Sequence, residues 1–238
     1  MKKKKVKVKD YTGKGFFLKF FSFFVVKIVD VYKRMRNGSS FEEFGLTMYC
    51  GRQGAGKTMA MTEYLERMRV KYPKALIITN YSYIHESRPM VDWGDFFKIQ
   101  NGTDGVIFAI DEIQNEFSSS AWKNFPESLL SEITQQRKQR VKIVCTSQIF
   151  TRVAKPLREQ ANDVVECRTL GGRWTFMKCY DAVDYSNNID SPTGKEKLRL
   201  LYRKSFLQDD NLRNLYDSYA KIERLERTVF MSKVERGA

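Results

Sequence analysis

Residues 51–58, GRQGAGKT, combine the residue types that bind nucleotide phosphates. Gly51, Gly56, Lys57 and Thr58 follow the P-loop spacing, with four residues between the first glycine and the Gly-Lys-Thr end. Glycines let backbone N–H groups approach the phosphates, the lysine brings a mobile positive charge, and the threonine hydroxyl is a ligand for Mg²⁺. The predicted nucleotide-binding residues are Gly51, Arg52, Gln53, Gly54, Ala55, Gly56, Lys57 and Thr58. The alternative is a glycine-rich turn that matches the spacing by chance.

A second set of candidates follows the apolar segment VIFAIDE, residues 106–112. Asp111 is predicted to hold Mg²⁺ and Glu112 to polarise an attacking water, since both acids follow a strand shortly after a P-loop. The alternative is a strand that merely ends on surface acids. An acid directly after the metal-binding aspartate indicates hydrolysis. ATP is the expected nucleotide because no [NT]-K-x-D guanine-reading motif is present.

A third polar strand end, in VKIVCTSQ, adds a candidate sensor of the γ-phosphate. Gln148 is the first choice and Ser147 the second, and the alternative is an ordinary polar strand end. Just before this strand, Arg137 and Arg140 are candidates for an arginine finger that reaches the ATP of a neighbouring subunit. The two arginines could equally complement the dipole at the end of a helix.

Alternating strand and helix patterns predict an α/β fold with a mostly parallel sheet flanked by helices. The expected strands are 46–50, 75–80, 106–111, 141–146, 163–169 and 174–180, with a further one within 197–206. The expected helices are 58–72, 92–100, 126–138 and 209–225, the last capped by Asp209 or Asp210. The helix after the glycine loop would turn its positive end toward the phosphates.

Composition narrows the function classes. The 238 residues carry a formal charge of +14; residues 1–14 hold a net +6, which leaves +8 for the remainder. A basic body as well as a basic arm favours an anionic partner, either nucleic acid or a lipid surface, over a merely soluble basic protein. The four cysteines show no C-x-x-C spacing, and the single histidine, His85, makes histidine-based catalysis improbable.

Residues 16–34 predict an amphipathic helix that follows a lysine-rich arm. Lys19, Lys27 and Asp30 interrupt the segment too often for a comfortable membrane span. Four interpretations stay open: the helix lies on a membrane surface, docks on a partner, covers the protein's own core, or spans the bilayer. We expect three parts: the arm and helix in 1–40, a P-loop ATPase domain in 41–222, and a tail in 223–238.

Five segments carry a family resemblance: GRQGAGKT, IDEIQNEF, ITQQRKQR, TSQIFTRVAKPLREQ and LRNLYDSYAKI. Together they resemble the zonula occludens toxin (Zot) family, FtsK/HerA-like P-loop ATPases of phage assembly and DNA handling. The resemblance covers about residues 45–222. It implies a P-loop NTPase fold of the ASCE type, a homo-oligomeric ring, ATP and Mg²⁺ as cofactors, and DNA as the cargo. Contacts with phage or portal proteins follow from the same resemblance.

One departure limits what the resemblance implies. Filamentous-phage members carry a membrane span and an outer domain after the ATPase, whereas this chain stops soon after the expected terminal helix. Toxin activity is therefore not expected, and membrane contact would use residues 16–34. We expect a cytoplasmic ATPase, peripheral to the inner face of the membrane if that helix binds lipid. The alternative is a membrane-associated morphogenesis or secretion ATPase that acts on proteins rather than on DNA.

Overall fold

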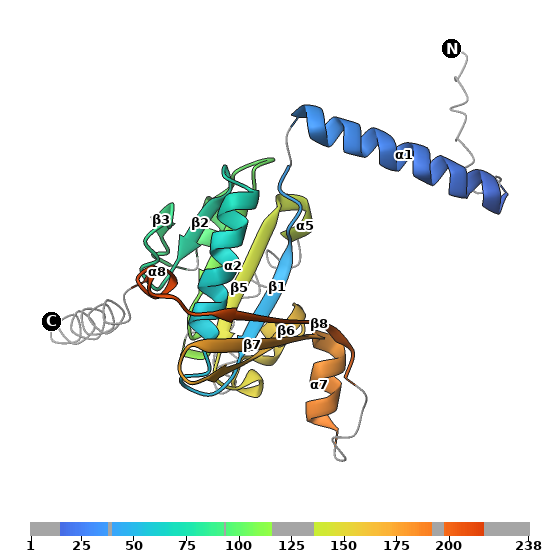
Figure 1. The fold of residues 1–238 in the computed structure, drawn as a ribbon. Helices are drawn as coiled ribbons and strands as arrows, with labels where there is room; N and C mark the ends of the chain where they lie inside the picture. Colours follow the sequence, from blue (N-terminus) through green and yellow to red (C-terminus); the bar gives the residue numbers. More distant parts are fainter. Residues whose placement is uncertain (1–14, 38–39, 93, 116–135, 192–197, 217–238) are drawn as a thin grey trace, which may run out of the picture. The chain divides into compact units, whose positions relative to one another are not determined.

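A computed structural model describes residues 15–37, 40–92, 94–115, 136–191 and 198–216 of the chain. The chain divides into two compact units, residues 1–40 and 41–238. The first contains the helix α1 (Phe16–Asn37). The second contains the sheet and every other described element (Figure 1).

The strands of the second unit are β1 (Gly45–Cys50), β2 (Leu76–Thr79), β3 (Arg88–Pro89), β4 (Val106–Ile110), β5 (Val141–Ser147), β6 (Ala161–Leu170), β7 (Trp174–Asp181) and β8 (Leu200–Leu207). The helices are α2 (Lys57–Lys71), α3 (Asp95–Lys98), α5 (Gln136–Gln139), α6 (Lys155–Arg158), α7 (Ala182–Asp190) and α8 (Asp210–Arg213), with 3₁₀ turns η1 (Ile113–Asn115) and η3 (Phe150–Arg152).

The strands form one sheet in the order β3-β2-β4-β5-β1-β6-β7-β8. All pairs from β3 to β6 are parallel, and β7 and β8 extend the sheet as antiparallel strands. The predicted mostly parallel α/β sheet is confirmed. β5 lies between the P-loop strand β1 and the acid-bearing strand β4. That insertion defines the ASCE class and brings the ends of β1, β4 and β5 to one edge of the sheet.

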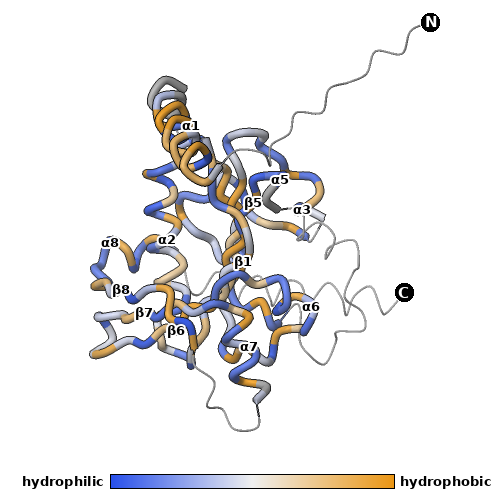
Figure 2. The backbone as a smooth tube through the Cα atoms, turned by 90° about the vertical axis from the view of Figure 1, so that its right-hand side faces the viewer, coloured by the Kyte–Doolittle hydropathy of each residue, from blue (hydrophilic) through white to orange (hydrophobic). Residues whose placement is uncertain are grey.

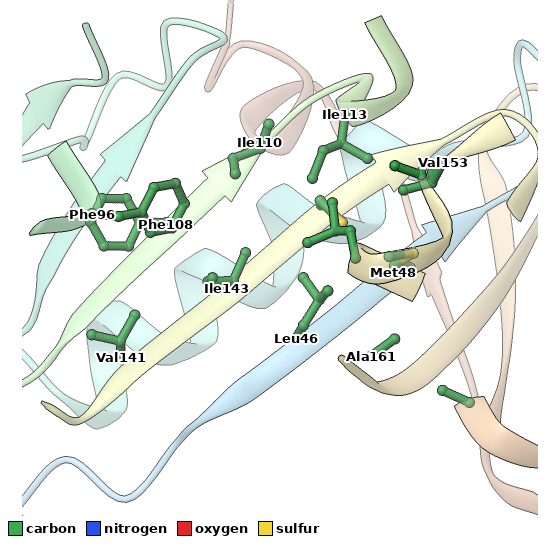
Figure 3. Packing of buried hydrophobic residues seen from close by; sticks show 14 of the residues in the cluster. Leu46, Met48, Phe96, Phe108, Ile110, Ile113, Val141, Ile143, Val153 and Ala161 are labelled. Carbon is green, nitrogen blue, oxygen red and sulfur yellow. The ribbon is translucent and has the colours of Figure 1, made fainter. Parts of the chain in front are cut away.

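Both faces of the central strands β1, β4 and β5 are covered, which explains why their sequences are largely apolar rather than alternating. Every residue of β1, β4 and β5 is buried. On one face α2 packs over β1 and β5 (Figure 1), and Met61, Leu65 and Met68 join the core there. The opposite face holds a second core under the short helices, in which the Phe96 ring stacks on that of Phe108 at 4.2 Å (Figure 3).

The predicted strands all form, with ends that differ from the prediction by no more than three residues. The helix predicted over 92–100 was too long, since only Asp95–Lys98 is helical. Its end is set by the core: Ile99 takes an extended conformation and is buried beside Phe96. Most of the helices predicted over 126–138 and 209–225 lies outside the described residues; within 209–225, α8 begins after Asp209, whose carboxylate caps it by accepting from the Leu212 N–H at 2.7 Å.

The four cysteines are buried in strands β1, β5, β6 and β7, and all are free thiols. Burial raises the pKa of the Cys167 thiol to about 12. These residues therefore pack as small hydrophobes and stay protonated at neutral pH.

The helix α1 exposes a run of aromatic side chains. Phe16, Phe17 and Phe21 are 76%, 84% and 71% exposed, and Phe20 packs edge-on against Phe24 with ring centroids 4.9 Å apart. The tube in Figure 2 is hydrophobic along much of α1 and is interrupted by hydrophilic positions. No helix within the described ranges is long and apolar enough to cross a membrane.

Candidate active site

The glycine loop joins β1 to α2 and has the backbone shape that a phosphate cradle needs. Gly54 and Gly56 take left-handed conformations with φ of 76° and 81°. Two features exclude a side chain at Gly56: its left-handed backbone, and the Thr169 hydroxyl oxygen, which would lie 2.4 Å from an added Cβ. α2 begins at Lys57, so its free N–H groups and positive dipole end point into the loop.

Lys57 lies folded over this loop. Its ammonium donates to the Arg52 carbonyl at 3.3 Å and lies 3.7 Å from the Glu112 carboxylate. The side chain is only 6% exposed, so its charge acts in a site largely shielded from water. The ammonium can therefore contact nucleotide phosphates as well as the carboxylate of Glu112, the predicted general base.

Asp111 is the most connected residue of the site. It follows β4, and its Oδ1 accepts hydrogen bonds from the Thr58 hydroxyl at 2.9 Å and the Thr146 hydroxyl at 2.7 Å. The backbone of Asp111 is held by the Asn80 side chain, which accepts from its N–H at 2.7 Å and donates to its carbonyl at 3.2 Å. These contacts join the ends of β2, β4 and β5 to the start of α2.

Glu112 sits beside Asp111 in a strained backbone conformation, with φ of 55°. Its N–H donates to the Thr146 hydroxyl at 2.8 Å, which holds the turn in place. Its carboxylate receives hydrogen bonds from Gln114 and, at 3.4 Å, from Gln148. Strain of this kind is retained where surrounding contacts over-determine it, as they do here.

Of the two sensor candidates, Gln148 faces the acids and Ser147 does not. Ser147 is buried at the end of β5 and donates its hydroxyl to the Ile149 carbonyl at 2.9 Å, within its own turn. The structure thus brings together Lys57, Thr58, Asp111 and Glu112 with Gln148 at the carboxyl ends of the parallel strands.

Arg140 is not brought to this cluster within its own chain. Arg140 precedes β5, at the opposite end of the strand from Gln148, and its guanidinium donates to the Thr103 carbonyl at 2.8 Å. The backbone of Arg137 lies in α5, and its side chain lies outside the described part of the molecule. A finger role for Arg140 would have to act on another subunit, and the finger role of both residues stays a prediction.

Sequence reasoning missed a polar cluster behind the P-loop, made of Thr169, Thr175 and Gln208. Thr169 donates to the Ala55 carbonyl at 3.0 Å and lies 2.8 Å from the Thr175 hydroxyl, and Gln208 donates to Thr175 at 2.7 Å. These residues come from β6, β7 and the end of β8, far from the loop in sequence. Thr175 is fully buried, so the antiparallel strands clamp the loop from behind.

A hollow of about 400 Å³ opens beside the loop. Its lining comes from Cys50, Gly51, Arg52, Gln148, Ile149, Phe150, Thr151, Glu166, Cys167, Tyr185 and Ile189. Ligand pockets of proteins begin at about 300 Å³, so the hollow can receive part of a nucleotide.

Thr58 and Asp111 offer oxygen ligands that suit Mg²⁺, since the Thr58 hydroxyl oxygen and the Asp111 carboxylate oxygen lie 2.9 Å apart. Within the described ranges, no three His, Cys, Asp or Glu side chains gather as a metal cage. Mg²⁺ in nucleotide sites does not require such a cage, because phosphates and water complete its coordination.

The fold and the site are those of a P-loop ATP hydrolase of the ASCE class. The family model of the zonular occludens toxin (Zot) matches residues 57–221, and the chain belongs to this family. No curated protein sequence matches the chain.

One solved structure supports the fold, and two others are similar at lower TM-scores. The N-terminal domain of zonular occludens toxin from Neisseria meningitidis is similar with a TM-score of 0.54 and 16% identity, over 73% of this chain and 98% of that chain. The genome packaging NTPase B204 from Sulfolobus turreted icosahedral virus 2, solved with ATP-gammaS, has a TM-score of 0.44 and 10% identity, over 66% and 95% of the two chains. The cytoplasmic domain of the Type VII secretion ATPase EccC from Thermomonospora curvata has a TM-score of 0.46 and 10% identity, over 71% of this chain and 24% of that one.

The hydroxyl of Thr146 bonds both Asp111 and the Glu112 N–H, so we expect its removal to impair ATP hydrolysis. Thr146→Val keeps the shape but leaves Asp111 with one hydrogen bond fewer and the Glu112 N–H without its acceptor. Loss of a group that orients a metal ligand typically costs about 10–100-fold in metal affinity or activity. We expect the rate of ATP turnover to fall by this factor. The Mg²⁺ concentration that gives half the maximal rate should rise. Ser147→Ala is the matched control, since its hydroxyl bonds only within the turn; an equal loss in both variants would contradict a specific role for Thr146.

Proposed function

We propose that this chain is a Mg²⁺-dependent ATPase that powers nucleic-acid translocation in the packaging or export of phage or mobile-element DNA. One observation carries the chemistry: Glu112 lies 3.7 Å from Lys57 and directly follows Asp111, whose carboxylate bonds Thr58. A phosphate-binding cation, a metal-binding pair and a general base meet at one edge of the sheet.

In the proposed mechanism the loop N–H groups and Lys57 bind the β- and γ-phosphates. Thr58 and Asp111 would hold Mg²⁺, which supplies positive charge against the charge that develops on the phosphates. Glu112 accepts a proton from a water whose oxygen attacks the γ-phosphorus, while the bond from that phosphorus to the β-phosphate oxygen breaks, and ADP and phosphate leave. The contact of Gln148 with the same carboxylate supports the proposal that Gln148 senses the γ-phosphate.

Membership of the Zot family and the charge of the chain support nucleic acid as the cargo. The formal charge of +14 is spread beyond the lysine-rich arm, and such a field attracts a polyanion over long range. Phage or portal proteins are the further partners that this role implies.

ATP turnover, measured with and without single- and double-stranded DNA, tests the proposal. The parent chain should hydrolyse ATP and respond to DNA. Lys57→Ala should lose nucleotide binding or turnover. Glu112→Gln should bind ATP and hydrolyse it on the order of a hundredfold more slowly, because the phosphate site is intact and the water is not activated.

Turnover of Glu112→Gln at the parental rate would remove the role of Glu112. An active parent that ignores DNA in every form would instead favour the alternative ATPase that acts on proteins.

Assembly into a homo-oligomeric ring is part of the proposal, with Arg137 as the first candidate finger and Arg140 as the second. We expect Arg137→Ala to lose roughly 10³-fold or more in turnover if its guanidinium reaches a neighbour's γ-phosphate. Capping a helix dipole would change stability by only about 0.3–1 kcal/mol. Mixing Arg137→Ala with Lys57→Ala subunits should restore activity that neither variant shows alone. Activity that mixing never restores means that Arg137 acts within its own chain, and a fully active Arg137→Ala passes the role to Arg140.

Binding of α1 to an anionic membrane surface is the last part of the proposal. Exposed phenylalanines and the lysines between them are the two elements of an interfacial helix. Each phenylalanine buried in lipid contributes about 1.5–3 kcal/mol, so replacing Phe20 and Phe24 by serine should weaken vesicle binding at least about 100-fold. Co-sedimentation with vesicles of neutral and anionic lipid measures this. Phe97→Ser, which alters an exposed phenylalanine of the other unit, should leave binding unchanged; undiminished binding of the double variant refutes the assignment.

A further inference from the structure

We propose that the exposed face of the antiparallel strands β6–β8 is a binding platform for single-stranded nucleic acid. The inference rests on the proposed function, because it names the surface and the strandedness of the cargo. We call this surface the β6–β8 platform, formed by Arg168, Leu170, Trp174, Phe176, Lys178, Arg203, Ser205 and Leu207. All eight side chains are exposed.

The strand register places these side chains in three rows on one face. Leu170, Trp174 and Leu207 form the outer row. Next come Arg168, Phe176 and Ser205, and then Lys178 paired with Arg203. Alternate residues of β7, including Thr175 and Met177, are buried on the other face. In Figure 1 the three strands lie together, with α7 at one end.

Two aromatic rings lie on β7, the middle strand of the platform. Trp174 is 45% and Phe176 37% exposed, and their ring centroids lie 4.7 Å apart. Neighbouring aromatic side chains on an open sheet face are the form in which proteins stack unpaired bases. A duplex hides its base faces by stacking, so these rings favour a single strand.

The charges of the platform suit a phosphate backbone. Lys178 and Arg203 lie directly opposite each other on neighbouring strands, an arrangement that is destabilising by itself and that an anion would relieve. Neither these two cations nor Arg168 makes an ion pair with the residues that the structure describes. The acid of this row, Glu166, lies opposite Lys178 on β6 and accepts a hydrogen bond from the Tyr185 hydroxyl of α7 at 3.0 Å. The open part of the face is therefore aromatic and basic.

The platform also lies one strand thickness from the phosphate loop. Trp174 and Phe176 flank Thr175, whose hydroxyl bonds Gln208 and Thr169 behind Gly56. A nucleic-acid strand bound on the outer face would contact Trp174 and Phe176, the two residues that flank the loop-supporting Thr175. This gives the cargo a short route to the site of hydrolysis.

Fluorescence anisotropy with a labelled oligothymidylate and a duplex of equal length, over a series of salt concentrations, tests the inference. The parent chain should bind the single strand more tightly. Trp174→Ala should weaken this binding roughly 5- to 150-fold, and Trp174→Tyr should retain most of it. Arg203→Ala should lower the slope of log affinity against log salt by about 0.7, the loss of one phosphate contact. Lys204→Ala, at the next position and on the opposite face of β8, is the control and should leave affinity near the parental value.

A second measurement uses only the parent protein and does not depend on variants that fold. Acetylation of Lys178 should slow when the oligonucleotide is added, while acetylation of Lys204 should not. Equal protection of both lysines, or parental affinity in Trp174→Ala and Arg203→Ala, would overturn the platform and leave DNA handling in place. Unchanged DNA affinity with a smaller sedimenting species in Trp174→Ala would make the face a subunit contact instead. Absence of any DNA binding by the parent would refute the platform together with the nucleic-acid part of the proposed function, whereas ATP hydrolysis would stand.

Discussion

The buried carboxylate of Asp111 is the constraint on which the arrangement of the site depends. A polar group that is 8% exposed is costly to bury unless it is hydrogen-bonded, and Asp111 receives hydroxyl bonds from α2 and from β5. Both bonds reach the same oxygen, so α2, β4 and β5 must meet at one point. They meet because β5 lies between β1 and β4 in the sheet. The hydrogen bonds of Asp111 therefore depend on this strand order.

The phosphate loop is constrained from the opposite direction by the antiparallel strands. Thr169, Thr175 and Gln208 fill the space behind Gly56, and the hydroxyl of Thr169 satisfies the Ala55 carbonyl. The loop is thus fixed between a buried acid in front and a polar cluster behind. Loop N–H groups can then be held ready for phosphates without large rearrangement, which is the condition for electrostatic preorganisation.

The sequence predicted most of the residues that would contact the nucleotide, and few of the residues that hold them in place. Glycine spacing, the acids after an apolar strand and the polar end of 141–148 are local patterns, and each was found where it was expected. The roles of Asn80, Thr146 and Thr175 could not be predicted, because a polar residue in a strand gains its meaning from a partner 30 or more residues away. Even so, Asn80 follows a parallel strand next to that of Asp111, a position that could have been singled out. The helix predicted at 92–100 failed for the same reason: burial of Ile99 overrode local propensity.

The two parts of the sheet divide the work of such a machine. The central parallel strands β1, β4 and β5 are buried on both faces and can present chemistry only at their ends, where the candidate site lies. The strand β7 is covered on one face, so the period-two alternation of side chains gives it an inner and an outer role. On β7 the inner residue Thr175 supports the loop, and the outer residues Trp174 and Phe176 remain open. A small displacement of this strand would be felt on both faces at once. If nucleic acid binds the β6–β8 platform as proposed, β7 is the element through which it would affect the phosphate loop.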